Sequence, residues 1–376
     1  MMEPNEHIDE SRRGFLSGQS LQDLVHAAVG REPRDHSAPV VPVIEPTGGP
    51  TLRLGTRAMA CDFGVVLNPG AHSLVSPASD ALELVHQLEQ QLTVYRHDSE
   101  VSQINDRAAD EPVPLEAGLY DRLALSLQLV RDTDGGFDPT SGPTIDVWRR
   151  ARRDGRVPTE EEIAETQAFV GSRHLTLDED RRTVRFATKG VELNFGAIGK
   201  GYALDRAAEV LEASGAADFL LHGGHSSLLA RGGHGLHEGW PVGLRNPLFT
   251  DRRLGTVLIR NQAMSTSGSN IQYYRHEGKR YGHILDPRTG MPVEGMLSAV
   301  VLAPTAALAD ALSTAFFVIG VENAAAYCHN HKDVTALLIP PPSGRRLCVL
   351  NCGVPSDQLF FVSQDSPDSA DICNLL

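Results

Sequence analysis

The sequence predicts an α+β fold in which mixed and antiparallel sheets pack against helices. Three observations support this class. Strand and helix patterns are mixed without the regular strand–helix–strand rhythm of a parallel doubly wound sheet. Three short strand patterns, at residues 174–177, 183–187 and 191–195, follow one another directly, as the strands of antiparallel hairpins do. No internal repeat at a fixed period is visible in the chain.

The composition is that of a globular protein, with 41% hydrophobic and 22% charged residues in a chain of 376. This length is sufficient for one large or two ordinary domains. No run approaches the roughly 20 apolar residues of a membrane-spanning helix. The net charge of −14 argues against a surface that binds nucleic acid. An anionic ligand would therefore have to be bound locally, by backbone amides, a basic side chain or a divalent cation.

The cysteines do not predict a disulfide framework. Their number is odd, none forms a Cys-x-x-Cys pair, and such frameworks are typical of much shorter chains. We expect buried or incidental thiols at Cys61, Cys328, Cys348, Cys352 and Cys373.

Three regions are expected along the chain. Residues 1–50 are polar and, after Glu32, rich in proline, which is typical of a tail or linker. Residues 51–355 carry the periodic patterns of a folded domain. Residues 356–376 are polar, and we expect a loose C-terminal tail there.

The N-terminal region contains a possible export signal. Residues 11–16 (SRRGFL) resemble a twin-arginine motif, but polar residues from Gln19 onward interrupt the apolar region that should follow. We expect a degenerate or absent signal, and a short amphipathic helix at residues 20–29 is the alternative. The compartment is then cytoplasmic or, if the Arg12-Arg13 signal functions, periplasmic. Because no lipobox cysteine lies near the N-terminus, a lipid anchor is not expected.

Apolar spacing and capping residues predict six helices in the folded domain. One opens at Ser76-Pro77 and continues along an apolar face to Leu92. A second covers residues 117–132 and ends before a Gly-Gly pair, and a capping box at Thr159 starts a third. The others are predicted from residue 197 to near 215, at 306–317 and at 322–329. Besides the three hairpin strands, strands are predicted at residues 63–67, 219–222, 241–244, 255–259, 298–302 and 334–339.

Residues 193–205 join the end of a predicted strand to the start of a predicted helix. The turn from Gly196 to Gly199 has little side-chain bulk, so backbone amides and a helix N-terminus can approach an anion such as a pyrophosphate. It is no Walker loop, because the spacing is one residue short and no Ser or Thr follows Lys200. Taken alone, these residues are explained more simply by an ordinary tight strand–helix connection.

Two positions are candidates for chemistry. His283 is predicted at the end of a strand that closes at Asp286-Pro287, where an imidazole can accept a proton near neutral pH. The alternative is a histidine bonded to the turn backbone. Asp310 and the hydroxyls that follow it lie in an otherwise apolar helix, where unpaired polar groups are costly. They suit a hard cation such as Mg²⁺; the alternative is an acidic residue favoured by the helix dipole.

Three further motifs are weaker. The hydroxyl-rich residues 264–268 suit either a phosphate or a turn, and residues 135–140 suit a helix C-cap followed by an Asp-Pro turn. His222 and His225 flank a Gly-Gly corner, but no further ligands follow at the spacing of a zinc site.

Taken together and in order, these stretches resemble the FAD:protein FMN transferase family, also called ApbE-like flavin transferases. The resemblance covers residues 51–352. It implies an ApbE-like (T-fold-like) α+β fold with the flavin site in a central cleft. The matching motifs are Met59, the segment from Leu92 to Asn105, Gly136 to Thr140, Gly196 to Asp205, Gly223-Gly224, Thr266 to Gly268, His283 to Gly290, and Asp310 to Thr314.

The resemblance implies a reaction and a set of roles. Such enzymes split FAD, move FMN onto a threonine or serine hydroxyl of a target flavoprotein, and release AMP. Mg²⁺ would be held by Asp310, Thr314 and the carbonyl of Ala197, and His283 would be the base. The FAD site would be lined by Met59, Tyr95, Gly136, Phe137, Asp138, Asn194, Lys200 and Ile284.

The chain departs from the family pattern at several positions. Asn194 stands where Asp is frequent, which keeps hydrogen-bonding capacity but loses charge. Ser313 stands where some members have Asp, which leaves the number of metal ions open. Two alternatives to transfer therefore remain: hydrolysis of FAD to FMN and AMP, and binding of FAD without catalysis. The identity of the acceptor protein and the oligomeric state do not follow from the sequence.

Overall fold

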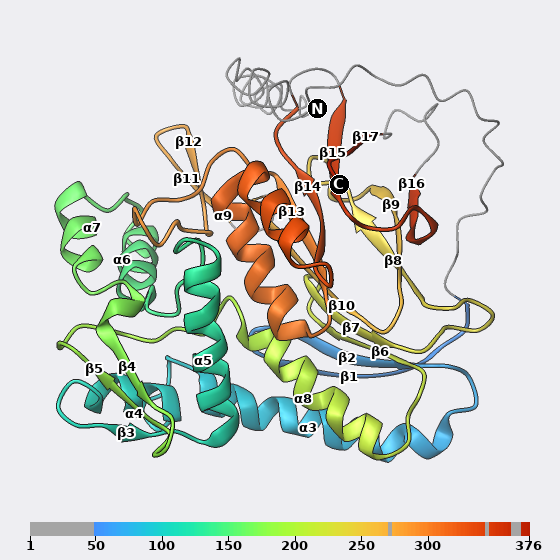
Figure 1. Ribbon diagram of the computed structural model, residues 1–376, viewed down its shortest axis with the longest axis horizontal. Helices are drawn as coiled ribbons and strands as arrows, with labels where there is room; N and C mark the ends of the chain where they lie inside the picture. The colour runs from blue at the N-terminus through green and yellow to red at the C-terminus, as the bar shows by residue number, and fades with distance from the viewer. Residues whose placement is uncertain (1–48, 270–272, 343–345, 362–369) are drawn as a thin grey trace, which may run out of the picture.

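The computed structural model describes residues 49–269, 273–342, 346–361 and 370–376. Its centre is a nine-stranded sheet in the order β1-β2-β6-β7-β10-β13-β14-β15-β17 (Figure 1). Neighbouring strands are antiparallel except β15 and β17, which run parallel. The strands are β1 (Leu52–Ala58), β2 (Cys61–Leu67), β6 (Phe219–Gly223), β7 (Ser227–Arg231), β10 (Ala263–Gly268), β13 (Ser298–Ala303), β14 (Thr335–Ile339), β15 (Leu347–Cys352) and β17 (Ala370–Asn374).

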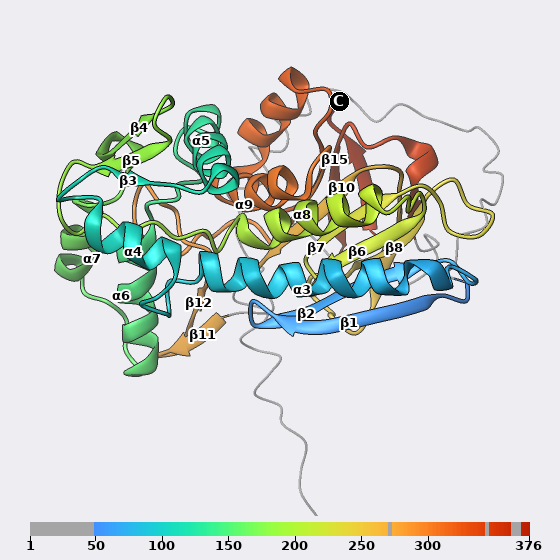
Figure 2. The same ribbon diagram turned by 90° about the horizontal axis from the view of Figure 1, so that it is seen from below.

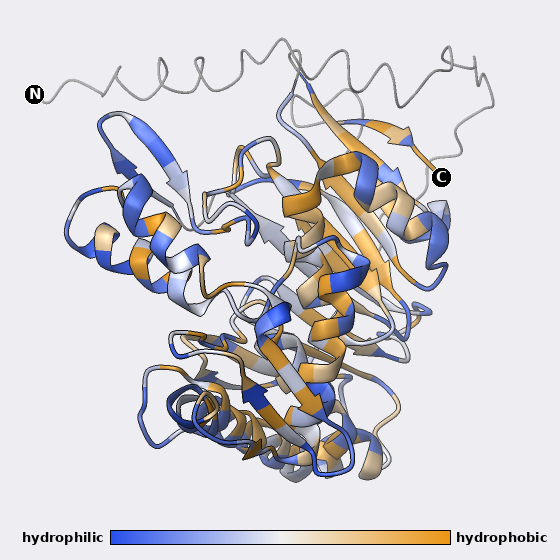
Figure 3. Ribbon diagram, turned by 60° about the vertical axis from the view of Figure 1, so that its left-hand side comes forward, coloured by the Kyte–Doolittle hydropathy of each residue, from blue (hydrophilic) through white to orange (hydrophobic). Residues whose placement is uncertain are grey.

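Both faces of this sheet are covered. Helices α3 (Val75–Leu92), α8 (Gly199–Ala213) and α9 (Ala306–Asn330) pack on one face (Figures 1 and 2). A three-stranded sheet of β8 (Trp240–Arg245), β9 (Arg253–Ile259) and β16 (Leu359–Phe361) contributes to the apolar cluster on the other. The main hydrophobic cluster lies on the face covered by α3, α8 and α9, and the second cluster lies on the face covered by β8 and β9. Successive side chains of β13 alternate between these two clusters, as the pleat of a strand requires. The inner strands β13 and β14 are therefore almost entirely hydrophobic (Figure 3).

A smaller part of the fold lies beside the main sheet (Figure 1, left). The helical elements are α4 (Glu100–Arg107), α5 (Ala117–Asp132), α6 (Gly142–Arg153) and α7 (Glu160–Gln167). The strands are β3 (Val113–Pro114), β5 (Thr183–Phe186) and β4 (Leu175–Asp178), which form one sheet, and β11 (Tyr273–His276) and β12 (Lys279–Gly282), which form a hairpin. Short 3-10 turns lie at His72–Leu74, Ser172–His174 and Ser356–Gln358.

The predicted α+β class is confirmed, and so are most of the elements that local signals define. Helix α5 has the predicted bounds, and the Thr159 capping box forms in full at the start of α7. The two helices predicted near residues 306–329 are one element, α9, with a break at Gly320 (φ 80°, ψ −178°). By length and composition α9 is the one helix among the described residues that could span a membrane, but it is a core helix packed between the sheet, α5 and α8.

The strand predicted at residues 191–195 is wrong. This segment forms a single isolated bridge, between Glu192 and Ser141. Its other polar groups find partners outside any sheet: the Asn105 side chain bonds both the N–H and the carbonyl of Leu193, and the Asn194 N–H donates to the carbonyl of Pro139. The helix that follows starts at Gly199, two residues later than predicted.

Other differences concern strand ends and the termini. The strand before His283 ends at Gly282 rather than at residue 286, because residues 284–293 fold back through a turn in which the Val293 N–H donates to the Ile284 carbonyl. The expected loose tail contains β16 and β17, whose apolar residues pack at the second cluster and pair with β9 and β15. Helices α4 and α6 were not predicted. The possible export signal and the helix at 20–29 lie outside the described residues.

Helices α8 and α9 approach each other very closely. A Cβ at Gly201 would lie 2.1 Å from the carbonyl oxygen of Ala306, so only glycine allows this contact. One turn later, the Asp205 carboxylate accepts hydrogen bonds from the N–H groups of Ala306 and Ala307 at 2.7 and 2.9 Å. Asp205 on α8 therefore satisfies two of the free N–H groups at the start of α9 and fixes the two helices against each other.

Protonation of Asp205 should make stability depend on pH. Burial outweighs the two hydrogen bonds and raises the pKa of Asp205 to about 6. Between about pH 4 and 6 the folded state then keeps a proton that the unfolded state has lost, so the free energy of unfolding falls as pH rises through this window. In Asp205→Asn, which mimics the protonated carboxyl, we expect this decline to shrink by up to about 3 kcal/mol.

Urea unfolding at pH 4, 5, 6 and 7 measures the effect. The exposed Asp333→Asn variant is the matched control, because it removes one carboxylate away from the helix contact. Parallel stability–pH curves for the wild type and Asp205→Asn would contradict the assignment.

Candidate active site

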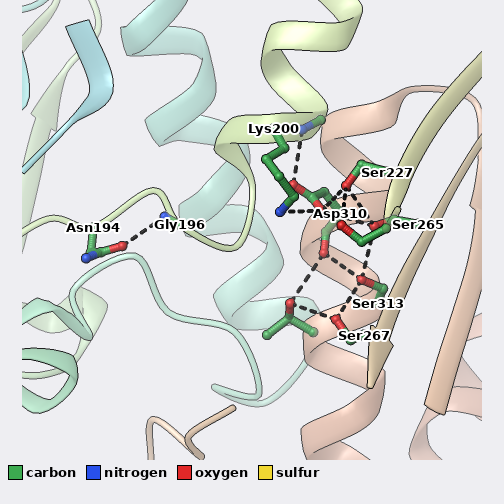
Figure 4. Close-up of polar contacts among 11 residues, drawn as sticks. Asn194, Gly196, Lys200, Ser227, Ser265, Ser267, Asp310 and Ser313 are labelled. Atoms are coloured by element: carbon green, nitrogen blue, oxygen red, sulfur yellow. Dashed lines mark hydrogen bonds and ion pairs between the residues drawn. The ribbon is translucent and has the colours of Figure 1, made fainter. Parts of the chain in front are cut away.

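The candidate site is built around the buried carboxylate of Asp310, which is 4% exposed. Its Oδ1 accepts hydrogen bonds from the hydroxyls of Ser227 at 2.9 Å and Ser265 at 3.0 Å, and its Oδ2 accepts one from the Gly201 N–H at 3.1 Å (Figure 4). Ser227 on β7 and Ser265 on β10 face each other directly in the strand register. Two strands and two helices thus meet at one carboxylate.

A positive charge lies beside this carboxylate. Lys200, in the first turn of α8, places its Nζ 3.5 Å from Oδ1 of Asp310 and keeps about a quarter of its side chain exposed. The carboxylate is therefore buried, whereas part of the Lys200 side chain is exposed to solvent. An anion that arrives from the solvent side would meet Lys200 first, together with the N-terminus of α8.

Hydroxyl groups continue along α9 from Asp310. The Ser313 hydroxyl donates to the Asp310 carbonyl at 2.9 Å and lies 3.0 Å from the Ser267 hydroxyl. The Thr314 hydroxyl lies 3.2 Å from the same Ser267 oxygen and is partly exposed. Asp310, Thr314 and the strand hydroxyls therefore form one continuous row of oxygen atoms.

These groups suit a hard cation that is bound together with a phosphate. Mg²⁺ prefers oxygen ligands and is commonly held by one or two carboxylates, with substrate phosphates and water completing its shell. Asp310 and Thr314 supply oxygens of this type, and the Ala197 carbonyl precedes α8 on the same turn as Gly199. Within the described residues no group of three or more His, Cys, Asp or Glu side chains is arranged to hold a metal. Asp310 and Thr314 therefore fit Mg²⁺ as two protein oxygen ligands, with the rest of its shell left to water and phosphate.

The loop before α8 is held by its own polar groups. The Asn194 side-chain oxygen accepts from the Gly196 N–H at 2.8 Å, away from the Asp310 cluster (Figure 4). The amide at position 194 therefore shapes the loop without a negative charge. The Ala197 side of the loop is partly exposed.

The segment from Gly136 to Thr140 is a rigid turn. The Asp138 carboxylate accepts from the Thr140 N–H and hydroxyl at 2.8 and 2.6 Å and from the Ser172 N–H at 3.1 Å. Phe137 is buried in the main cluster, and a Cβ at Gly136 would lie 2.2 Å from the Ile319 side chain. In this structure Asp138 and Phe137 hold the turn in place.

Met59 is half-buried in a turn, whereas Tyr95 is exposed. Met59, in the β1–β2 turn with φ 47°, donates its N–H to Glu89 at 2.7 Å. Tyr95 is 70% exposed, and the guanidinium of Arg149 lies 4.8 Å from its ring centre. Such an exposed, oriented ring can stack on a planar ligand.

His283 is exposed directly after β12, and its neighbour Ile284 is buried in the main hydrophobic cluster. That cluster also contains Ile198 and Ala309, which flank the loop before α8 and Asp310. The imidazole is therefore carried by a segment whose backbone is anchored in the same core as the Asp310 site.

The structure joins some of the predicted site residues and leaves others with separate partners. Lys200, Asp310 and Thr314 are linked through the oxygen row, whereas Met59, Asp138 and Asn194 are bonded elsewhere.

The sequence did not predict Ser227 and Ser265, the two residues whose hydroxyls donate hydrogen bonds to Asp310. The hydroxyl-rich run 264–268 was a signal for Ser265, although it lies in strand β10 rather than in a turn.

Comparison with known proteins identifies the family. The ApbE family model matches residues 59–338. The FAD:protein FMN transferase of Haemophilus influenzae is 32% identical over 261 residues, which is 67% of this chain and 75% of the relative. The protein of the same name from Treponema pallidum is 30% identical over 303 residues, covering 75% of this chain and 82% of the relative.

Solved structures agree with the sequence comparison. The ApbE protein of Thermotoga maritima superposes with a TM-score of 0.71 at 26% identity, covering 77% of this chain and 94% of the other. The flavinyl transferase ApbE of Pseudomonas stutzeri, in its apo form, gives 0.69 at 26% identity, with 81% and 98% covered. From the family match and these relatives, this chain is an enzyme that belongs to the ApbE family of FAD:protein FMN transferases.

Proposed function

We propose that this enzyme transfers FMN from FAD to a threonine or serine hydroxyl of a target flavoprotein and releases AMP, with Mg²⁺ bound at Asp310. The observation that carries the proposal is the position of Asp310, a buried carboxylate with the ammonium of the partly exposed Lys200 3.5 Å away. This pair can bind a diphosphate and the cation that accompanies it. The relatives are FAD:protein FMN transferases, and this name states the reaction: transfer of FMN from FAD to a protein.

The reaction is the displacement of one oxygen at phosphorus by another. The acceptor hydroxyl forms a bond to the FMN phosphorus, the bond from that phosphorus to the bridging oxygen breaks, and AMP leaves with the bridging oxygen. Such transfers depend on positioning and on the neutralisation of charge. Asp310, Thr314 and the carbonyl of Ala197 would hold Mg²⁺, which when bound offsets the charge of the diphosphate.

The residues of this chain would divide the remaining work. Lys200 can leave the Asp310 carboxylate at 3.5 Å and pair with a phosphate oxygen instead. Tyr95, exposed and backed by Arg149, can stack on a ring of FAD. His283 would take the proton of the acceptor hydroxyl at a ring nitrogen, which is a common role for an exposed imidazole near neutral pH.

Mass spectrometry tests the function directly. The purified full-length protein is incubated with FAD, Mg²⁺ and a protein extract of the host, and AMP is measured in parallel. We expect peptides that have gained the mass of FMN on threonine or serine, with one AMP for each. FMN and AMP without a modified peptide would show that water is the acceptor. Binding of FAD without AMP at any Mg²⁺ concentration would show a flavin-binding protein.

His283→Ala should abolish transfer but retain FAD binding. Loss of a general base lowers rates by about 10²–10⁴-fold, whereas the side chains proposed to bind FAD are unchanged. Transfer is followed by flavin fluorescence of the acceptor, and FAD binding by titration. His329→Ala, which removes an exposed histidine at the end of α9, is the matched control. Transfer at the wild-type rate in His283→Ala would remove His283 from the mechanism.

Asp310→Asn should change the response to metal. The amide keeps the shape of the side chain but loses the charge, so the Mg²⁺ concentration for half-maximal AMP release should rise at least about tenfold, and the maximal rate should fall. Asp333→Asn should behave as wild type. Chelation of divalent cations should stop AMP release in the wild type. An unchanged Mg²⁺ profile in a folded Asp310→Asn variant would place the cation elsewhere.

A further inference from the structure

Strand β15 carries two thiols, and each of them meets a second thiol from another element. Cys348 lies at the outer end, where its Sγ is 3.2 Å from the Sγ of Cys373 on β17. Cys352 lies at the other end of the strand, close to Cys328 of α9. Four of the five cysteines thus form two close pairs, and each of them is a free thiol. This arrangement was not predicted, because the residues of each pair are far apart in the sequence.

The outer pair is held in place by the strand register. Strands β15 and β17 run parallel, with Cys348 opposite Asp371 and Leu350 opposite Cys373. Because side chains alternate between faces, Cys348 and Cys373 lie on the same face of the sheet. Two hydrogen bonds also hold β17 to β15 on the C-terminal side of Cys373. Asn351 Nδ2 donates to Asn374 Oδ1 at 3.0 Å, and the Leu375 N–H donates to the Asn351 carbonyl at 2.9 Å.

The two pairs differ in access to solvent. Cys328 and Cys352 are both buried, whereas Cys348 and Cys373 are both partly exposed. A small reagent can therefore reach the outer pair in the folded protein but not the inner pair. Burial, followed by the hydrogen bond with Cys373, raises the pKa of Cys348 to about 12, so this group is a thiol rather than a thiolate at neutral pH. We therefore expect exchange at the outer pair to be slow.

We propose that Cys348 and Cys373 form a reversible disulfide that ties the C-terminal strand β17 to the main sheet. The oxidant is a low-molecular-weight disulfide such as oxidised glutathione. One cysteine sulfur bonds to a sulfur of the reagent and releases its first thiol; the second cysteine then attacks that mixed disulfide and releases the other. In sum, two cysteine thiols are oxidised, one small disulfide is reduced to two thiols, and the cysteine protons pass to the released thiols.

The bond closes a loop between positions separated by 25 residues and joins the edge strand of the sheet to its neighbour. A cross-link of this kind removes conformations from the unfolded chain in which β17 is detached. The disulfide should therefore raise the temperature of unfolding, by roughly 3–8 °C for a loop and a chain of this size. In the sheet order, β13 and β14 lie between this pair and the Asp310 partners on β7 and β10, so this effect is separate from the proposed transfer reaction.

Thiol counting tests the proposal on the full-length protein. Reduced protein is equilibrated with oxidised glutathione, acid-quenched, denatured and alkylated. Of the five cysteines, all should be alkylated in the reduced sample and three in the oxidised one. A chymotryptic digest should contain the Cys348 and Cys373 peptides linked to each other, and the thermal midpoint of the oxidised sample should be higher. Activity is not needed for any of these readouts.

Cysteine variants make the test specific. Cys373→Ser and Cys348→Ser should each lose the oxidant-induced rise in thermal midpoint and form no intramolecular link, so failure of one variant to fold leaves the other. Cys61→Ser is the matched control and should still lose two thiols on oxidation. Full alkylation after equilibration, a link between other cysteines, or a linked protein with an unchanged thermal midpoint would each overturn the proposal.

Discussion

The burial of one carboxylate determines how the rest of the site is built. A buried, ionised Asp310 is costly unless several donors replace water. The fold provides a hydroxyl from each of two neighbouring strands, a backbone N–H from α8 and, 3.5 Å away, the ammonium of Lys200. These donors come from three different elements, β7, β10 and α8, and the carboxylate from a fourth, α9, so they can meet only when the sheet and both helices are assembled. The geometry of the site is thus a property of the whole core.

The close contact between α8 and α9 is the second constraint. Gly201 lets the helices touch where any side chain would collide with the Ala306 carbonyl, and Asp205 bonds the first N–H groups of α9. Gly201 also bonds the Asp310 carboxylate itself. Because these residues follow Lys200 on one helix, the position of the ammonium is coupled to the position of the carboxylate. A shift between the helices would therefore disturb both charges of the proposed diphosphate site.

The sequence predicted what depends on local signals and failed where distant residues decide. The α5 bounds and the Thr159 capping box are local, and both are confirmed. Residues 191–195 have a strand pattern, but their backbone is bonded by Asn105, 88 residues before Leu193, which no local pattern reveals. Likewise, the partners of Asp310 follow from the register of β7 with β10. The resemblance to a family named Asp310 and Thr314 without that register, but not Ser227 or Ser265.

The departures from the family pattern have a physical interpretation in this structure. Ser313 donates to the Asp310 carbonyl and contacts Ser267, so its hydroxyl is part of the helix–sheet contact rather than a free ligand. Asn194 bonds the Gly196 N–H and adds no charge. The charged groups at the oxygen row are therefore one carboxylate, Asp310, and one ammonium group, Lys200, so its formal charge is close to zero. A diphosphate brings negative charge to this row, and the protein as a whole carries −14. Lys200 alone cannot offset that charge, which is why we propose a divalent cation at Asp310 and Thr314 for this reaction.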